Sequence, residues 1–292
     1  MIESWHGGVL MKKAISIWSF SGKSVRESMT LAKKAGFKGI ELALDETGEI
    51  SMDTKHSDLV KIRDYSERLG LEIHSLATGL YWSYSFASED EGQREKAYKI
   101  AVRQIETAKA LGADRVLIIP GHVSVSFAPA LGVIPYDVAY KRALEGINRL
   151  KSVAEKNEIN VGLENVWNNF LLSPIEMRDF IDEINSSWVG AYFDVGNVVA
   201  TGHPEHWIKI LGSRIKKVHL KDYRLNPGGL GGFVDLLSGD VNWPEVMKAF
   251  KEIGYDSWAT AEMLPPYKFH TDQIVYNTSQ SMSRILGGTE HA

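Results

Sequence analysis

The chain has 292 residues, of which 44% are hydrophobic and 24% charged, a composition typical of a globular protein with a buried core. Lys plus Arg (33) against Asp plus Glu (37) gives a formal net charge of −4, which argues against a nucleic-acid-binding protein because such proteins usually carry a basic stripe. Cysteine is absent, so disulfides and thiolate metal sites are excluded, and any metal must be held by histidines and carboxylates.

The first residues of the chain do not have the pattern of a signal peptide. Residues 1–12 lack the long apolar core and the small-residue cleavage site of a signal peptide, so we expect an N-terminal extension, with Met11 as an alternative start. Residues 287–292 are expected to form a loose tail. No apolar run reaches the roughly 18 residues of a membrane span. We therefore expect a cytoplasmic protein with no membrane partner.

Strand-like runs alternate with amphipathic helical runs along the chain. Strands are expected at Ala14–Phe20, Gly39–Leu44, Glu72–Thr78, Arg115–Gly121, Ile159–Val166, Val189–Val195, Ile215–Asp222 and Trp258–Met263. Helices are expected near Val25–Ala35, Lys55–Leu69, Asp90–Leu111, Tyr136–Lys156, Pro174–Asn185, Pro204–Leu211, Trp243–Ile253 and Asp272–Ile285. This strict alternation predicts an α/β protein with a (β/α)8 TIM barrel as a single domain over residues 13–286.

Local signals agree with these elements. Four of the expected helices are followed by a glycine, in the segments KKAGF, RLGL, ALGA and EIGY, where a left-handed C-cap residue belongs. Ser173 and Asn242 each precede a helix as N-cap candidates, with a glutamate three residues later. A doubly wound open sheet is the runner-up fold, but Ile17–Gly22 after the first strand does not match the GxGxxG phosphate loop.

Four consecutive strands end with a side chain that can bind a metal. These side chains are Glu164, Asp194, His219 and Glu262. In a barrel the carboxyl ends of the strands meet at one face, and alternation along each strand puts these groups on the lumen side. Three carboxylates and one imidazole form an oxygen-rich site that suits Mn²⁺ first, then Mg²⁺ or Co²⁺; Zn²⁺ is less favoured with a single nitrogen ligand. The sequence therefore predicts one divalent metal ion.

Other side chains are candidates for binding a substrate. Lys221 shares the face of His219 and can hold a hydroxyl or phosphate group, or pair with a nearby carboxylate. Glu41 and His74 should point into the lumen, where a structural hydrogen bond is the alternative to a substrate contact. His122 follows the fourth strand and can reach a substrate. Trp18 lies near a strand end and can stack on a sugar ring or pack within a loop.

The segment Asn226–Gly239 is rich in glycine and follows the seventh strand, so it is expected to form a mobile lid over the site. Its glycines and the guanidinium of Arg224 are alternatively suited to binding a phosphate group.

Several motifs together resemble a known superfamily. The segments LEN, FDVGN, VHLKD and TAEM, with a second strand at Ile40–Thr47, resemble the xylose-isomerase-like sugar isomerases and epimerases over roughly Ala14–Ile285. The closest group is that of L-ribulose-5-phosphate 3-epimerases and hexulose-6-phosphate isomerases, which are related to the D-tagatose 3-epimerases. Asn197 stands where the D-tagatose 3-epimerases carry a histidine, which favours the sugar-phosphate group and makes Asn197 a candidate substrate contact.

The resemblance implies that Glu164, Asp194, His219 and Glu262 bind one divalent metal, and that Glu164 and Glu262 act as acid and base on opposite faces of a ketose. We expect an isomerase that moves a proton next to a carbonyl through an enediolate. Epimerisation and aldose–ketose isomerisation need the same groups, so both stay open. The partner is expected to be a small-molecule sugar or sugar phosphate, with homodimer or homotetramer formation.

Three other functions remain as alternatives. An inosose-type dehydratase would use the same metal site, and a non-catalytic sugar-binding barrel would bind without reaction. A family-two apurinic endonuclease needs more histidine ligands, and Asn197 and the acidic net charge argue against it.

Overall fold

The computed structural model describes residues 11–263 and 268–287. Within these ranges, eight parallel strands close into a barrel in the order β1-β10-β7-β6-β5-β4-β3-β2. The strands are β1 (Lys12–Ser16), β2 (Gly39–Leu44), β3 (Glu72–Thr78), β4 (Arg115–Ile118), β5 (Asn160–Glu164), β6 (Val189–Asp194), β7 (Ile215–Leu220) and β10 (Trp258–Ala261). The predicted (β/α)8 barrel is confirmed.

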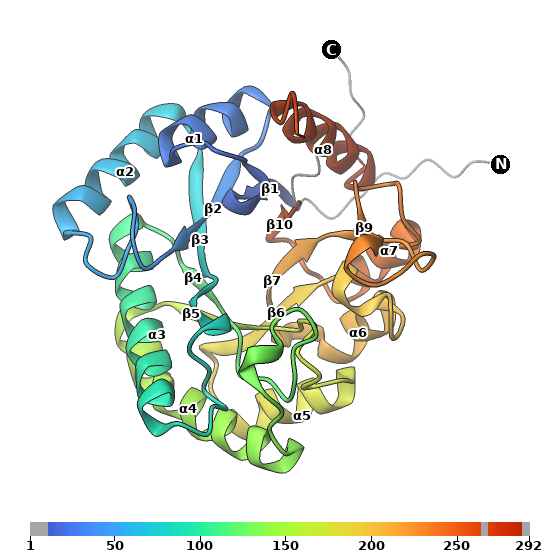
Figure 1. Cartoon of the computed structure of the whole chain (residues 1–292). Helices are drawn as coiled ribbons and strands as arrows, with labels where there is room; N and C mark the ends of the chain where they lie inside the picture. Colours follow the sequence, from blue (N-terminus) through green and yellow to red (C-terminus); the bar gives the residue numbers. More distant parts are fainter. Residues whose placement is uncertain (1–10, 264–267, 288–292) are drawn as a thin grey trace.

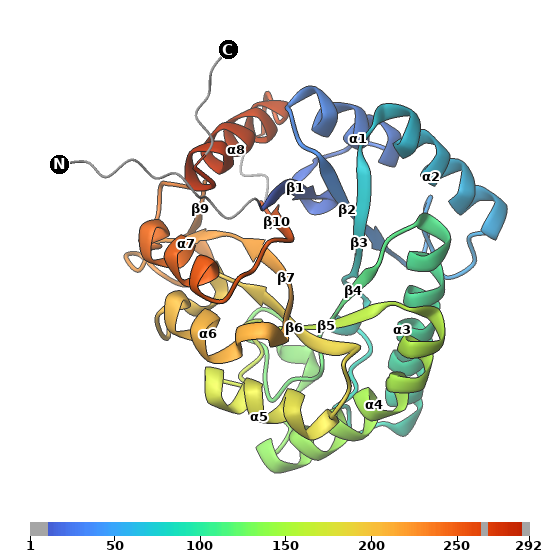
Figure 2. The same ribbon diagram turned by 180° about the vertical axis from the view of Figure 1, so that it is seen from behind.

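Helices surround this barrel, as Figures 1 and 2 show from its two ends. They are α1 (Val25–Lys34), α2 (His56–Leu69), α3 (Glu91–Leu111), α4 (Tyr136–Asn157), α5 (Pro174–Ile184), α6 (Pro204–Leu211), α7 (Trp243–Glu252) and α8 (Asp272–Ile285). Their buried aliphatic side chains and the outward-facing residues of the strands form one hydrophobic core. No described helix is long and apolar enough to cross a membrane.

The helix ends follow the capping signals in the sequence. The side chain of Ser173 accepts a hydrogen bond from the backbone N–H of Glu176 at the start of α5. Gly70 and Gly112 end α2 and α3 in the left-handed region, with φ of 60° and 81°, which glycine adopts without the strain that a Cβ would cause. The capping residues therefore determine where these helices begin and end.

The structure differs from the predicted elements mainly at the carboxyl ends of the strands and in the loops that follow them. The expected strand Ala14–Phe20 stops at Ser16, because a short 3₁₀ turn over Ile17–Ser19 follows it. Two short strands, β8 (Asp222–Tyr223) and β9 (Phe233–Val234), pair antiparallel after β7. They lie above the barrel at the end that carries the candidate site.

The predicted N-terminal extension and tail fall almost entirely outside the described residues. Of residues 1–12 only Met11 and Lys12 are described, and Lys12 already begins β1. Of residues 287–292 only Gly287 is described. The domain limits at residues 13 and 286 therefore stay a prediction.

Candidate metal and sugar site

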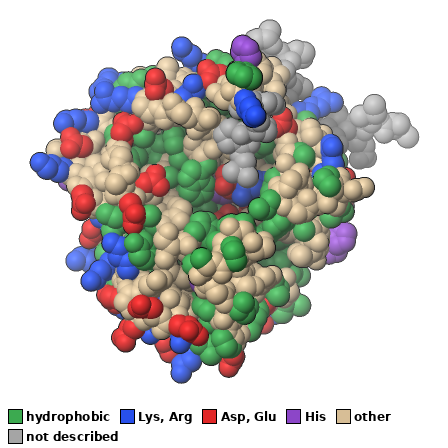
Figure 3. Space-filling view, viewed as in Figure 1, with side chains coloured by type: hydrophobic (Ala, Val, Ile, Leu, Met, Phe, Trp, Pro, Cys, Tyr) green, Lys and Arg blue, Asp and Glu red, His purple; other side chains and the backbone are tan. Residues whose placement is uncertain are grey.

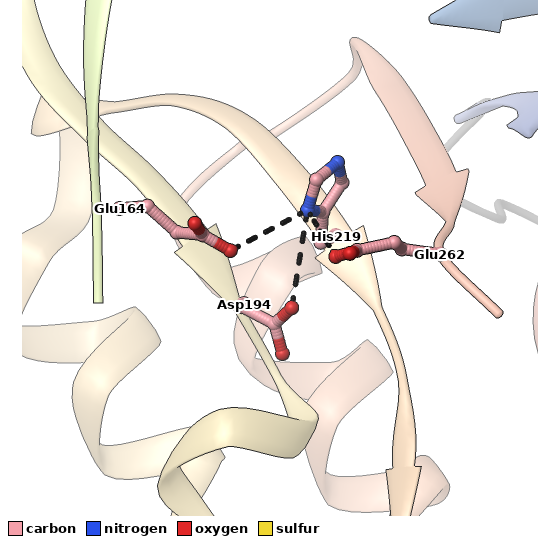
Figure 4. Close-up of side chains that lie close together, drawn as sticks. All are labelled: Glu164, Asp194, His219 and Glu262. Carbon is pink, nitrogen blue, oxygen red and sulfur yellow. Dashed lines mark ion pairs between the residues drawn. The ribbon is translucent and has the colours of Figure 1, made fainter. Parts of the chain in front are cut away.

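Four buried side chains converge at the carboxyl end of the barrel. Glu164 ends β5, Asp194 ends β6, His219 lies near the end of β7, and Glu262 directly follows β10. One ligand atom from each lies within 4.8 Å of the others. Figure 4 shows the three carboxylates pointing at one nitrogen of the imidazole, with Glu164 and Glu262 on either side of it. The strands β5, β6, β7 and β10 are consecutive neighbours in the barrel, so closure of the sheet itself brings these side chains together.

The two ring nitrogens of His219 have different surroundings. Nδ1 lies 3.7 Å from Glu164 Oε1, 3.9 Å from Asp194 Oδ2 and 3.1 Å from Glu262 Oε2. Nε2 lies 2.9 Å from Oε1 of Glu41, which is fully buried behind the ring. A proton on Nε2 would be donated to Glu41 and would leave the Nδ1 lone pair directed at the carboxylates. Burial alone would lower the pKa of His219, but Glu41 and the site carboxylates raise it well above the usual value.

Hydrogen bonds hold the carboxylate of Asp194 in one orientation. Its Oδ1 accepts from the backbone N–H of Asn197 at 2.9 Å. The side-chain amide of Asn165 bonds to both backbone groups of Asp194, at 2.8 and 2.9 Å. Asn197 in turn donates its side-chain amide to the carbonyl of Asn165 at 2.9 Å. Asp194 Oδ2 is thus the oxygen left facing the site.

Lys221 is the cation within this group of acids. Its Nζ lies 3.1 Å from Asp194 Oδ2 and 2.6 Å from Glu262 Oε2. Burial alone would lower the pKa of Lys221, but Asp194 and Glu262 raise it. Burial raises the pKa of Glu164 to about 7, whereas at Glu262 the nearby Lys221 and His219 outweigh burial and lower the pKa to about 2. Without a bound metal ion, Glu164 is therefore protonated at a higher pH than Glu262.

The chemistry of the group fits a divalent metal ion. His219 Nδ1, Asp194 Oδ2 and Glu262 Oε2 are buried and make no well-oriented hydrogen bond in the described chain, although Lys221 Nζ forms ion pairs with the two carboxylate oxygens. Buried polar atoms are normally satisfied, and a cation at their common centre would contact all three. Three carboxylate oxygens and one imidazole nitrogen match the preferences of Mn²⁺, Mg²⁺, Co²⁺ or Zn²⁺. The four side chains could therefore hold a divalent metal ion.

A cavity of about 620 Å³ opens beside these groups. Glu164, Glu262 and Lys221 line its charged part, and most of its other lining is aromatic or aliphatic. Figure 3 shows hydrophobic side chains around the hollow and acidic and basic atoms deeper inside it. The cavity therefore joins the candidate metal site to the protein surface.

The structure brings some of the expected substrate contacts to this cavity. Trp18, Asn197 and Lys221 are among its lining residues. Asn197 is only 7% exposed, and its side chain is already hydrogen-bonded to Asn165. Trp18 and Lys221 are therefore the better placed of the three to meet a ligand directly.

Four expected substrate contacts do not line the cavity. Glu41 is behind His219, and His74 stacks on Trp258 at 4.8 Å, one layer deeper in the barrel. The alternation of side chains along a strand correctly predicts that Glu41 and His74 point into the barrel. It does not predict how far below the cavity they lie. His122 is buried with Nδ1 2.9 Å from the Ser85 hydroxyl.

Arg224 is the fourth expected substrate contact that does not line the cavity. It lies outside the cavity lining, and its guanidinium donates to the carbonyl of Ser238 within the loop 226–239. The guanidinium is thus held by the loop in this structure, and the expected contact of Arg224 with a phosphate group stays a prediction.

Sequence reasoning missed several residues that shape the site. Phe127 and Leu230 line the cavity from loops and Phe233 lines it from the two-residue strand β9, and in such segments no periodicity marks an inward side chain. Tyr192 was also missed as a partner of Glu41, to which its hydroxyl donates a short hydrogen bond. The signal for Tyr192 was present, since it stands two residues before Asp194 and so shares its face.

The comparisons with known proteins agree with this geometry. The family model "Xylose isomerase-like TIM barrel" matches residues 29–280, so the chain belongs to that family. L-ribulose-5-phosphate 3-epimerase UlaE of Salmonella heidelberg is 23% identical over 246 residues, which is 80% of this chain and 80% of that protein.

Two solved structures share the fold. A D-psicose 3-epimerase crystallised in the presence of D-fructose superposes with a TM-score of 0.79 at 16% identity, covering 96% of this chain and 100% of that one. The IOLI protein, with a bound zinc atom, superposes with a TM-score of 0.78 at 18% identity, covering 95% of this chain and 98% of that one. UlaE and the D-psicose 3-epimerase are named as sugar epimerases, which are isomerases, the class that the family resemblance implied.

Proposed function

We propose that the protein is a metal-dependent epimerase or isomerase that acts on a ketose through an enediolate. The observation that carries this proposal is the convergence of Glu164, Asp194, His219 and Glu262, with buried atoms that make no well-oriented hydrogen bond, at the end of a cavity. The activities named for UlaE and for the D-psicose 3-epimerase support the reaction class.

These four side chains would hold the ion, with Mn²⁺ as the first candidate. A bound divalent ion would polarise the ketose carbonyl and make the neighbouring C–H more acidic. Asn165 and Asn197 orient Asp194, and Glu41 orients His219, so the ligand atoms are preorganised.

The two glutamates would move the proton. Glu164 and Glu262 approach the site from β5 and from the residue after β10, on either side of His219. One carboxylate oxygen removes the proton from the carbon next to the carbonyl, and the other carboxyl group returns a proton on the opposite face. Lys221, whose Nζ pairs with Asp194 and Glu262, would donate a further hydrogen bond to a substrate oxygen.

Proton exchange in D₂O tests this mechanism. The Mn²⁺-loaded protein should form new diastereomers from a member of a panel of pentuloses and hexuloses, free and phosphorylated, with deuterium at the epimerised carbon by NMR. Glu164→Gln and Glu262→Gln should each lose at least ~10²-fold in turnover. Each should still exchange the proton of one epimer through the remaining glutamate.

The control is Glu67→Gln, since Glu67 is an exposed residue of α2 and its loss should leave the rate unchanged. Near-normal interconversion by both Gln variants with metal bound would refute the two-glutamate mechanism. A product that has lost water would instead indicate the dehydratase alternative.

A further inference from the structure

The outer part of the cavity is more apolar than the binding of a free ketose requires. Two aromatic pairs line it. Trp82 and Phe127, from the loops after β3 and β4, meet edge to face with ring centroids 5.0 Å apart. Trp167, from the loop after β5, and Phe233, from β9, have ring centroids 5.1 Å apart. These walls offer apolar faces and few hydrogen-bonding groups to whatever fills the space between them.

The cavity is also larger than a single sugar requires. Its volume of about 620 Å³ is within the range of ~300–1,000 Å³ that is usual for drug-sized ligands. A pentulose or hexulose held at the carboxylates would leave the aromatic part to water, which gains nothing from apolar walls. Phe127 and Leu230 are 42% and 52% exposed, so the unfilled cavity leaves large hydrophobic side chains in contact with solvent.

The charges of the lining disfavour a phosphate group. Among the described lining residues Lys221 is the cation, and its Nζ is paired with Asp194 and Glu262. The same lining contains the carboxylates of Glu164, Asp222, Asp235 and Glu262. A phosphate monoester carries about −1.5 to −2 charges at neutral pH and is normally met by arginine or several N–H donors. Arg224 does not line the cavity.

We propose that the substrate is an uncharged keto sugar bearing a second ring, in other words a glycosylated ketose, whose extra ring lies between the aromatic pairs. This inference rests on the proposed function, because the keto end must lie at the carboxylates. Stacking of the apolar face of a sugar ring on indole and phenyl rings excludes water from both surfaces. The proton transfer itself is unchanged: one C–H bond breaks, one forms, and no oxidant or reductant takes part.

A matched set of three ketoses tests the proposal. D-fructose, D-fructose 6-phosphate and isomaltulose are the same ketose with a hydroxyl, a phosphate or a glucosyl group at the same oxygen. Dissociation constants are measured by calorimetry on the Mn²⁺-loaded protein, and C–H exchange in D₂O is followed by NMR. We expect isomaltulose to bind at least ~10-fold more tightly than either of the other two, the scale of modest added contacts in an apolar pocket.

Two variants test whether the outer part of the cavity causes the preference for isomaltulose. Leu230→Ala and Phe127→Ala should reduce the preference for isomaltulose over D-fructose at least ~3-fold, since each removes apolar surface from the outer cavity. Leu172→Ala is the matched control, because Leu172 is 57% exposed but does not line the cavity, and it should keep the preference.

The outcomes separate the two proposals. Tighter binding of D-fructose 6-phosphate or of D-fructose than of isomaltulose would overturn the inference about the substrate, whether or not exchange occurs. Absence of exchange with the whole ketose panel would count against the proposed function, while the order of the dissociation constants still decides the inference. Phe127→Ala could instead change the sedimentation coefficient and leave the order of the dissociation constants unchanged. That result would assign the aromatic wall to a contact between subunits, and it would also overturn the inference about the substrate.

Discussion

At the scale of single residues, the site depends on which nitrogen of His219 faces the carboxylates. Glu41 determines this by accepting from Nε2, and Glu41 is itself held by the hydroxyls of Ser75, at 2.9 Å, and Tyr192. All four side chains are buried, so water cannot replace these hydrogen bonds. Burial raises the pKa of Glu41, but His219 outweighs this effect and the pKa is lowered overall, which keeps the carboxylate charged behind the ring.

We predict that Glu41→Gln weakens Mn²⁺ binding ~10–100-fold, the usual effect of removing a carboxylate that orients a metal-binding histidine. The amide keeps the size of the side chain but loses the charge, and it can turn its NH₂ group toward the ring. Calorimetric titration with Mn²⁺ measures the change, and circular dichroism checks the fold. Ser75→Ala is the control, because it removes one hydrogen bond but leaves the carboxylate in place, so its loss should be smaller. Unchanged affinity in a folded Glu41→Gln variant would contradict this role.

The sequence was informative about the face of each residue in a strand but not about its depth. Alternation in the strands predicted that Glu164, Asp194, His219 and Glu262 share one face, and they do converge. The same alternation placed His74 inward without showing that it lies beside Trp258, below the cavity. Depth depends on the stagger between neighbouring strands, including the register shift between Ile40 and Glu41, and a single sequence does not contain that stagger.

At the scale of elements, Asp222 organises the loop that follows β7. Its carboxylate accepts from the backbone N–H of Tyr223 and Leu237 at 2.9 Å each, and from the indole N–H of Trp243 at 3.1 Å. A Cβ on Gly239 would lie 2.2 Å from Asp222 Oδ1, so only glycine lets the loop close this tightly. The glycine-rich composition indicated a loop, whereas strands as short as β8 and β9 have no periodicity to predict them.

We predict that Asp222→Ala speeds amide hydrogen exchange in residues 226–239 at least ~10-fold, since lost hydrogen bonds to a charged group cost about 1.5–3 kcal/mol. Mass spectrometry of the exchanged peptides measures this. Asp137→Ala, at an exposed position in the first turn of α4, should leave exchange in the loop unchanged. Equal exchange rates in both variants would show that Asp222 does not anchor the loop. The expected closure of this loop over a ligand stays a prediction, which the same method tests in the presence of isomaltulose.

At the scale of the whole molecule, the barrel could be predicted because every local signal agreed. The alternation of strands and helices, the caps at Ser173 and Asn242 and the glycines after the helices all favour the same eight-fold unit. The cavity could not be predicted in the same way, because loops from distant parts of the chain build its outer walls. Contacts such as Trp82–Phe127 and Trp167–Phe233 depend on the closed barrel to bring those loops together.

A metal bound by ligands from β5, β6, β7 and the end of β10 would tie together four neighbouring strands, so it should stabilise the entire fold. At a Mn²⁺ concentration of ~100 times the dissociation constant, the free energy of unfolding should rise by about 2.7 kcal/mol. Melting temperature changes by roughly 2–4 °C per kcal/mol in domains of 150–250 residues and by less in larger ones, so an increase of several degrees is expected. Differential scanning calorimetry with and without Mn²⁺ measures it.

This stabilisation should depend on pH in a definite direction. The carboxylates raise the pKa of His219 well above its usual value, and burial raises that of Glu164 to about 7, so both hold protons in the absence of metal as pH falls below about 7. Metal binding must displace those protons, and each displaced proton weakens the affinity ~10-fold per unit decrease in pH. The increase in melting temperature at fixed Mn²⁺ should therefore shrink from pH ~8 to pH ~6. Asp194→Asn, which removes a ligand charge, should lose most of the increase at both pH values. An increase that is independent of pH, or that persists in Asp194→Asn, would mean that the ion stabilises the barrel from another place.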